Sequence, residues 1–230
     1  MSLVLSIETS TGICSVAVTR DGECVLEKID RTGPNHAERL GTFIDEAFSY
    51  MELRDLTPDC VAVSSGPGSY TGLRIGVSMA KGIAYGKDIP LISVPTLQLQ
   101  TVAPLLYHDE IPEDALFCSM IDARRMEVYA EVYDRSLKVV RPCQPDIVDA
   151  DTYKELLDKQ PVYFLGEGSA KCKDVIAHPN AHFLDGIEPL ARYMAPLAEM
   201  RLRKNQTEDV AYFVPFYLKD FVAGKPKKKV

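Results

Sequence analysis

One segment, residues 64–86, limits the fold more than any other part of the chain. An apolar run at 60–63 precedes it, and Gly66, Pro67 and Gly68 then interrupt regular structure. After this turn, apolar residues recur with the spacing of a helix. The segment therefore predicts a strand, a tight turn and a helix in succession.

Small residues follow one face of the expected helix. Gly72, Gly76, Ala80 and Ala84 fall four apart, so they form a stripe without large side chains. Each interior glycine costs roughly 1 kcal/mol of helix stability relative to alanine. The helix must recover this free energy by close packing, against its own core, a ligand or another protein.

Composition excludes several classes of protein. The chain has 230 residues, 46% of them hydrophobic, and a formal net charge of -7. It therefore has enough apolar residues for a core but does not resemble a protein that grips nucleic acid over its whole surface. The six cysteines show no C-x-x-C spacing, and no signal peptide or membrane-length apolar run is visible. We expect a cytoplasmic protein from a reducing compartment.

The order of elements predicts an α/β protein with mixed sheets and flanking helices. We expect a first domain at 1–110 and a smaller second domain at 111–230, whose last helix returns to the first. The strands expected in the first are 3–7, 13–19, 24–29, 60–63 and 91–94, and the helices are 36–51, 72–86 and 96–106. The strands expected in the second are 117–121, 127–133 and 162–165, and the helices are 151–157 and 189–203.

Several short motifs together carry a family resemblance. They are Ile7-Glu8-Thr9-Ser10, Asn35-His36-Ala37-Glu38-Arg39-Leu40, the residues 66–76, Ile121-Asp122-Ala123-Arg124, and Pro215-Phe216-Tyr217-Leu218. With these motifs the chain resembles the TsaB (YeaZ) family of tRNA threonylcarbamoyladenosine biosynthesis. The resemblance implies two ribonuclease-H-like domains of the actin, sugar-kinase and heat-shock-ATPase superfamily.

The resemblance also implies a role without catalysis. Members of this family are non-catalytic relatives of TsaD; they pair with a TsaD-like catalytic subunit through their N-terminal helices and act with a TsaE-like ATPase. The complex, rather than this subunit alone, then handles tRNA and adds threonylcarbamoyl to N6 of the adenosine beside the anticodon, in tRNAs that read codons starting with A. We therefore expect no catalytic residues and no cofactor.

A metal site is not expected. The catalytic relative uses two histidines spaced i, i+4 on a helix, whereas this chain has His36 followed by Leu40, which cannot bind metal. Another pair with this spacing, His178 and His182, contains Pro179 and is expected to lie in a surface turn.

The superfamily's nucleotide cleft has counterparts here. An acidic residue after the first strand of each domain would be Glu8 and Asp122, with Thr9, Ser10, Gly166 and Gly168 in the adjoining loops. The loop 123–125 lacks a glycine that would admit a phosphate. We expect a vestigial cleft; the alternative is a nucleotide-dependent transferase or kinase that uses Glu8 and Asp122.

The two N-terminal helices are the candidate partner surface. A charged and aromatic edge beside an apolar seam suits the rim of an interface, although the stripe could instead pack only on its own sheet. The candidate interface residues are His36, Leu40, Phe43, Ala47, Arg74, Gly76, Ser78, Ala80, Lys81 and Tyr85. Without the partner, the same surface would support a homodimer. The basic run 225–229 is expected to be a solvated end.

Overall fold

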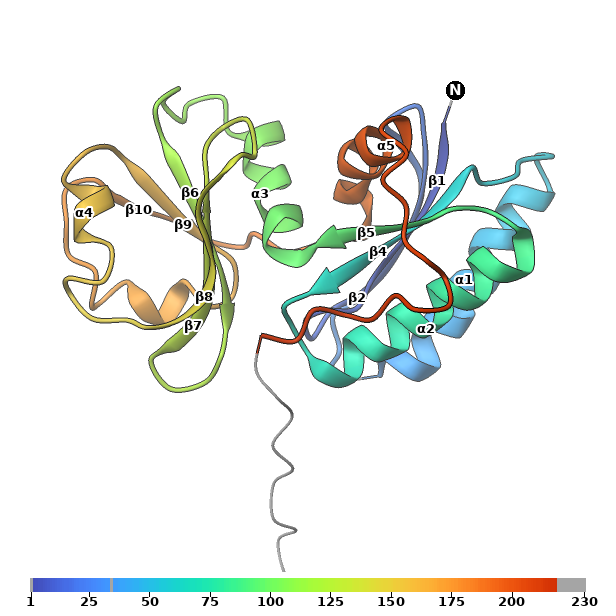
Figure 1. The fold of residues 1–230 in the computed structure, drawn as a ribbon, viewed down its shortest axis with the longest axis horizontal. Helices are drawn as coiled ribbons and strands as arrows, with labels where there is room; N and C mark the ends of the chain where they lie inside the picture. Colours follow the sequence, from blue (N-terminus) through green and yellow to red (C-terminus); the bar gives the residue numbers. More distant parts are fainter. Residues whose placement is uncertain (1, 34, 219–230) are drawn as a thin grey trace, which may run out of the picture.

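Two five-stranded mixed sheets form the framework of the protein. A computed structural model describes residues 2–33 and 35–218 (Figure 1). The first sheet has the order β3-β2-β1-β4-β5 and the second the order β10-β9-β6-β7-β8. The first sheet contains β1 (Leu3–Glu8), β2 (Cys14–Arg20), β3 (Glu23–Asp30), β4 (Cys60–Gly66) and β5 (Leu91–Pro95). The second contains β6 (Leu116–Asp122), β7 (Glu127–Tyr133), β8 (Val139–Ile147), β9 (Val162–Leu165) and β10 (Ala181–Leu184).

The second sheet repeats the connectivity of the first. In each, three strands form an antiparallel meander, a later strand joins the first strand of that meander in parallel, and a further strand pairs in parallel with this later strand. Polar turns after β1 and β6 begin both meanders in the same way. The predicted α/β fold with two related mixed sheets is therefore confirmed.

Helices cover both faces of the first sheet. The helices are α1 (His36–Glu52), α2 (Tyr70–Lys87), α3 (Thr96–Tyr107), α4 (Lys154–Leu157) and α5 (Ala195–Arg203), with short 3-10 turns η1 (Ala170–Cys172) and η2 (Ala191–Met194). One apolar cluster joins α1 and α2 to one face, and a second cluster joins α3, η2 and α5 to the other. Helix α3 also contacts β6 and β7, so it lies between the two sheets (Figure 1).

The chain crosses between the sheets more than once. After the second sheet, η2 and α5 pack against β1, β2 and β5 of the first. The expected division at residue 110 therefore stays a prediction. The basic run 225–229 lies outside the described residues. None of the helices described is long and apolar enough to cross a bilayer.

Two edge strands and two helix boundaries differ from the sequence predictions. No strand was expected for β8, which carries Pro142 and Pro145, because proline interrupts strand patterns; at a sheet edge its missing N–H is tolerated. No strand is expected for β10 either, because the sequence from His178 to His182 predicts a surface turn. Of the helix expected at 151–157, only the four residues of α4 are helical. The helix expected at 189–203 is divided into the 3-10 turn η2 and α5, with Pro196 in the first turn of α5.

Candidate functional site

A cleft of about 650 Å³ lies where β1, β4 and β6 end. Its walls come from the loop after β1, the first turn of α2, the β6–β7 turn and residues 216–218. A smaller cavity of about 260 Å³ shares Thr11 and Glu167 with it. The cleft is thus the place where the two sheets present their loops to each other.

Close packing of α2 on the loop after β1 shapes one wall of this cleft. A Cβ added at Gly68, Gly72 or Gly76 would lie less than 3.0 Å from atoms of Thr9 or Ser10. The Thr9 hydroxyl donates a hydrogen bond to the Gly72 carbonyl at 2.8 Å. Gly72 and Gly76 of the small-residue stripe therefore pack against a loop of the same chain, and Ala80 and Ala84 pack in the apolar core.

Glu8 is sealed beneath this loop. It is fully buried, and its Oε1 accepts hydrogen bonds from the Ser10 N–H at 2.5 Å and from the Ser10 hydroxyl. Burial raises the pKa of Glu8 to about 7, and the hydroxyls of Ser10 and Ser64 only partly offset this effect. Its Oε2 is buried without a hydrogen-bond partner of good geometry among the described residues. Glu8 lines neither cavity, so in this arrangement it holds the turn rather than a ligand.

Asp122 reaches the cleft, but its carboxylate is already engaged. The Lys171 ammonium group donates to Asp122 and, at 2.6 Å, to the Glu127 carbonyl. The Arg124 N–H donates to the same carboxylate at 2.9 Å. Partial burial alone would raise the pKa of Asp122, yet these donors lower it. A cation of the chain itself therefore balances this carboxylate.

The glycines expected around a phosphate serve close packing instead. A Cβ at Gly166, whose φ is +88°, would collide with the Met120 carbonyl, and one at Gly168 would collide with the backbone of Ile121. The Gly168 N–H donates to the Met120 carbonyl at 3.3 Å. These residues therefore hold the loop after β9 against β6.

The expected histidine positions are structural. His36 is buried, and its Nε2 lies 2.9 Å from the Thr11 carbonyl oxygen, while Leu40 is fully buried in the core. In the described part of the chain, no group of three or more His, Cys, Asp or Glu is placed to hold a metal ion. The surface turn expected for the other pair is wrong for His182, which lies in β10 and stacks on Tyr163 with ring centroids 4.7 Å apart.

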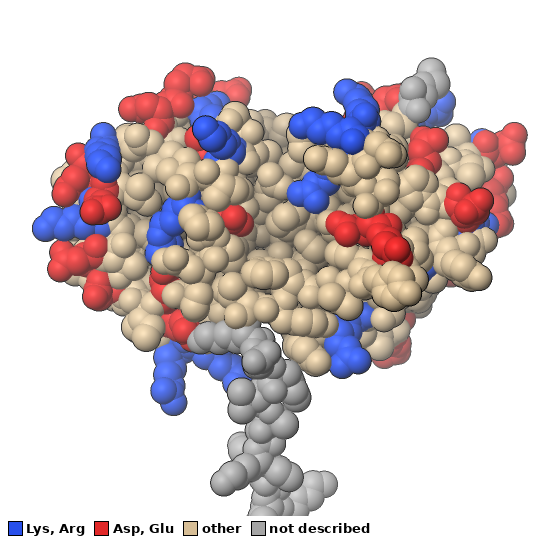
Figure 2. All heavy atoms as spheres, viewed as in Figure 1, with Lys and Arg blue, Asp and Glu red and all other residues tan. Residues whose placement is uncertain are grey.

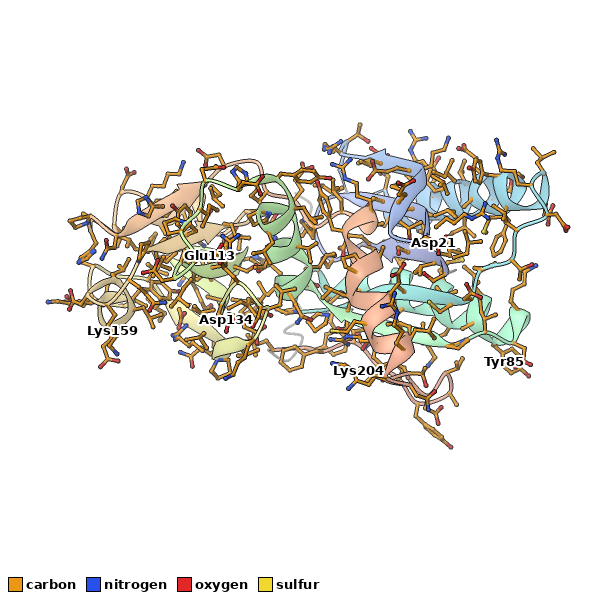
Figure 3. The ribbon with its side chains drawn as sticks, turned by 90° about the horizontal axis from the view of Figure 1, so that it is seen from above. Asp21, Tyr85, Glu113, Asp134, Lys159 and Lys204 are labelled. Carbon is orange, nitrogen blue, oxygen red and sulfur yellow. The ribbon has the colours of Figure 1, made fainter. Side chains whose placement is uncertain are left out.

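The candidate interface residues divide into two groups. His36, Leu40, Ala47, Gly76 and Ala80 are buried against the chain's own sheet and loops, so their expected place on an outward surface is wrong. Phe43, Arg74, Ser78, Lys81 and Tyr85 are exposed or partly exposed. Figure 3 shows Tyr85 near the end of α2 that is far from the second sheet.

A C-terminal strap, residues 208–218, was not expected at this site. Its Glu208 N–H donates to the Leu91 carbonyl and its Phe216 N–H to the Ser65 carbonyl, at 2.9 and 2.7 Å. Lys81 of α2 donates to the carbonyls of Ala211 and Phe213, both at 3.1 Å. In the sequence, only the family motif at 215–218 indicates that this strap matters. No sequence pattern predicts that Lys171 contacts Asp122.

Comparison with known proteins places these features in a family. Residues 30–227 match the family model described as TsaD, tRNA N6-adenosine threonylcarbamoyltransferase. A *Bacillus subtilis* protein named tRNA threonylcarbamoyladenosine biosynthesis protein TsaB is 32% identical over 75% of this chain and 74% of its own length. The *Escherichia coli* protein of the same name is 29% identical over 96% of both chains.

Solved structures agree in fold. YeaZ from *Pseudomonas aeruginosa* superposes with a TM-score of 0.77 at 23% identity, covering 95% of this chain and all of that one. A second structure, described as similar to peptidase YeaZ from the same organism, has a TM-score of 0.80 at 22% identity with the same coverage. These structures support the fold, and the sequence matches show that this chain belongs to the TsaB (YeaZ) family.

Proposed function

We propose that this chain is a non-catalytic subunit in tRNA threonylcarbamoyladenosine biosynthesis. In this role it binds and activates a TsaD-like catalytic subunit, which acts with a TsaE-like ATPase on the adenosine beside the anticodon. The names of the relatives support the pathway, and the state of the cleft supports the absence of catalysis.

One observation carries the non-catalytic part of the proposal. Both carboxylates that nucleotide chemistry would need are engaged inside the chain: Glu8 holds Ser10, and Asp122 holds Lys171. Mg²⁺ requires several accessible oxygen ligands, and neither residue offers a carboxylate that is both exposed and unpaired.

The partner surface is the outward side of α1 and α2. Ser78 and Tyr85 of α2 are exposed there, and Tyr85 is 84% exposed. Phe43 and Phe48 of α1 are only partly buried, so apolar area remains at the edge of the seam between the helices. Such a mixture of aromatic and small polar residues is typical of interfaces. In the absence of the partner, the same side would support self-association.

Substituting one exposed residue on α2 tests the proposal. We expect Ser78→Arg to abolish co-purification with the TsaD-like subunit and to lower tRNA modification in a reconstituted reaction, because a bulky charge cannot be accommodated at a packed interface. Glu155→Arg is the control, since α4 lies at the opposite end of the molecule (Figure 1). Circular dichroism would show that both variants remain folded.

Two results would contradict the proposal. One is full complex formation and modification by the Ser78→Arg variant. The other is ATP hydrolysis by the isolated chain that is lost in both Glu8→Ala and Asp122→Ala, since this would establish the nucleotide-dependent alternative.

A further inference from the structure

Aromatic side chains from three separate segments meet at the mouth of the cleft. Tyr70 begins α2, Tyr129 lies on β7, and Phe216 and Tyr217 belong to the C-terminal strap; all four line the cleft. The rings of Tyr70 and Tyr217 are 4.8 Å apart between centroids, and Phe216 and Tyr217 are 48% and 37% exposed. Tyr70 and Tyr129 are engaged within the chain, so the exposed rings of Phe216 and Tyr217 are the ones open to an unstacked nucleobase.

Arginines lie beside these aromatic rings. The Arg74 guanidinium group lies 5.4 Å from the Tyr70 ring centroid and donates to its hydroxyl at 3.3 Å. Arg124 lines the opposite wall, on the β6–β7 turn, and Arg125 follows it. Within residues 2–33 and 35–218, no carboxylate forms an ion pair with any of these three arginines. Their charges are therefore available to a phosphate backbone.

The two arginine positions lie on either side of the cleft opening. Figure 2 shows Lys and Arg atoms near the lower edge of the molecule, in the half with the second sheet on the left and in the half with the first sheet on the right. In the same orientation, the β6–β7 turn and the first turn of α2 lie at that edge (Figure 1). A strand of nucleic acid that spans the opening would thus meet a cation on each side.

Carboxylates also line the cleft. Glu127 is engaged within the chain, whereas Glu167 is exposed. Carboxylates accept hydrogen bonds from the exocyclic amino groups of bases, as they do from cytosine N4. Asp122 adds little negative charge because Lys171 balances it. Within a volume of about 650 Å³, the cleft offers stacking surfaces, an acceptor for an amino group, and cations at its edge.

We propose that this cleft binds one unstacked, amino-bearing nucleotide of a single-stranded RNA segment, with its base stacked on the exposed rings of Phe216 and Tyr217 and its flanking phosphates on Arg74 and Arg124. The inference rests on the proposed function, in which the complex handles tRNA, and assigns to this subunit a direct RNA contact. The net charge of -7 is compatible with it, because the contact is local and needs only these two cations.

Fluorescence anisotropy with labelled oligoadenylate, oligouridylate and oligolysine tests this proposal on the full chain at low salt. We expect oligoadenylate to bind and the affinity to fall as salt rises, since phosphate contacts release counterions. The Arg74→Ala/Arg124→Ala double variant should bind about tenfold more weakly and show a smaller salt slope. Tyr217→Ala should lose about tenfold through stacking, whereas Glu167→Gln should reduce the preference for oligoadenylate over oligouridylate.

Arg54→Ala is the matched control. Arg54 also lies over a tyrosine, 3.8 Å from the Tyr50 ring centroid, but it follows α1 and does not line the cleft. We expect its RNA affinity to equal that of the unmodified chain. Thermal melting of every variant would show whether the fold is intact, and Tyr217→Phe, which keeps the ring, should retain binding.

Several outcomes would overturn the proposal. They are no RNA binding at low salt, equal losses in the Arg54 and cleft variants, AMP binding as tightly as oligoadenylate, and oligolysine binding in place of RNA. The proposed function is tested separately, because Ser78→Arg lies outside the cleft. If the cleft variants lose RNA binding but still form the complex with the TsaD-like subunit, the inference is supported. If the unmodified chain forms this complex but binds no RNA, the inference is overturned and the proposed function is not.

Discussion

Three consecutive residues after β1 fix the loop that joins β1 to β2 and lines the cleft. Thr9, Ser10 and Thr11 are all buried, and each has a hydrogen bond to a different segment or side chain: Thr9 to Gly72, Ser10 to Glu8 and Thr11 to His36. The loop is therefore held by the chain's own hydrogen bonds, although Ser10 and Thr11 also line the cleft.

The buried carboxyl of Glu8 makes stability depend on pH. A carboxyl with a higher pKa in the folded than in the unfolded chain binds more protons when folded, so stability falls as pH rises from about 4.5 to about 7. The full difference corresponds to about 3 kcal/mol. We expect Glu8→Gln to flatten this dependence in urea denaturation across that range. The exposed control Glu38→Gln should keep the pH dependence of the parent chain. An unchanged dependence in Glu8→Gln would show that Glu8 is not its source.

Glycines on the two sides of α2 should respond in opposite ways to substitution. Gly72→Ala places a methyl group against the Thr9 carbonyl, so we expect a loss of about 3 kcal/mol in the free energy of unfolding. Gly82→Ala, on the exposed side with no atom within 4 Å, should gain up to about 1 kcal/mol from helix propensity. Chemical denaturation measures both, and a neutral Gly72→Ala would contradict the close packing.

At the scale of elements, the C-terminal strap joins β5, α2 and the cleft. It follows α5, crosses the edge of the first sheet beside β5 and ends among the aromatic residues of the cleft (Figure 1). Lys81 links it to α2, the helix that we assign to the partner surface. The strap therefore connects the two proposed surfaces physically.

Removing the Lys81 ammonium group should loosen this strap. We expect Lys81→Met to speed hydrogen exchange of the Phe216 and Glu208 N–H groups by at least about tenfold, because two charge-assisted hydrogen bonds are lost. Exchange measured by mass spectrometry tests this expectation. Lys87→Met, at the exposed end of the same helix, should leave these amides unchanged, and equal exchange in both variants would count against the anchoring role.

At the scale of the whole molecule, an exposed ion pair holds the segment between β10 and η2, where the chain returns from the second sheet to the first. Arg31, after β3, forms a bidentate pair with Glu188, with Nη2 2.7 Å from Oε2. The neighbouring Ala191 N–H donates to the Ser15 hydroxyl of β2 at 3.0 Å. These contacts fix the segment between β10 and η2 against the first sheet.

This ion pair should contribute modestly and in a salt-dependent way. A double-mutant cycle on Arg31→Ala and Glu188→Ala should give a coupling energy of about 1 kcal/mol that decreases with added salt. The Arg203–Glu199 pair within α5, which has a single contact at 3.3 Å, should give about 0.3 kcal/mol. Equal coupling energies for the two pairs would contradict the expectation that the Arg31–Glu188 pair stabilises the fold more than an ion pair within one helix does.

The sequence alone determined the strands and helices that have strong periodic patterns, and with them the succession of elements that forms the mixed first sheet. Apolar spacing and turn residues act over a few neighbouring positions, so the strand, turn and helix around Gly66 could be predicted directly. The four-residue spacing of Gly72 and Gly76 likewise required a close contact on that face of the helix.

Only the tertiary structure decided which groups meet across the chain. The stripe on α2 faces Thr9, Asp122 pairs with Lys171, and Phe216 reaches Ser65, each over dozens of intervening residues. Such pairings depend on how two sheets and their loops are placed in space, which local spacing does not encode. The edge strands β8 and β10 depend on tertiary structure for the same reason. Their short or proline-containing sequences do not predict a strand, and they become strands because they pair with β7 and β9.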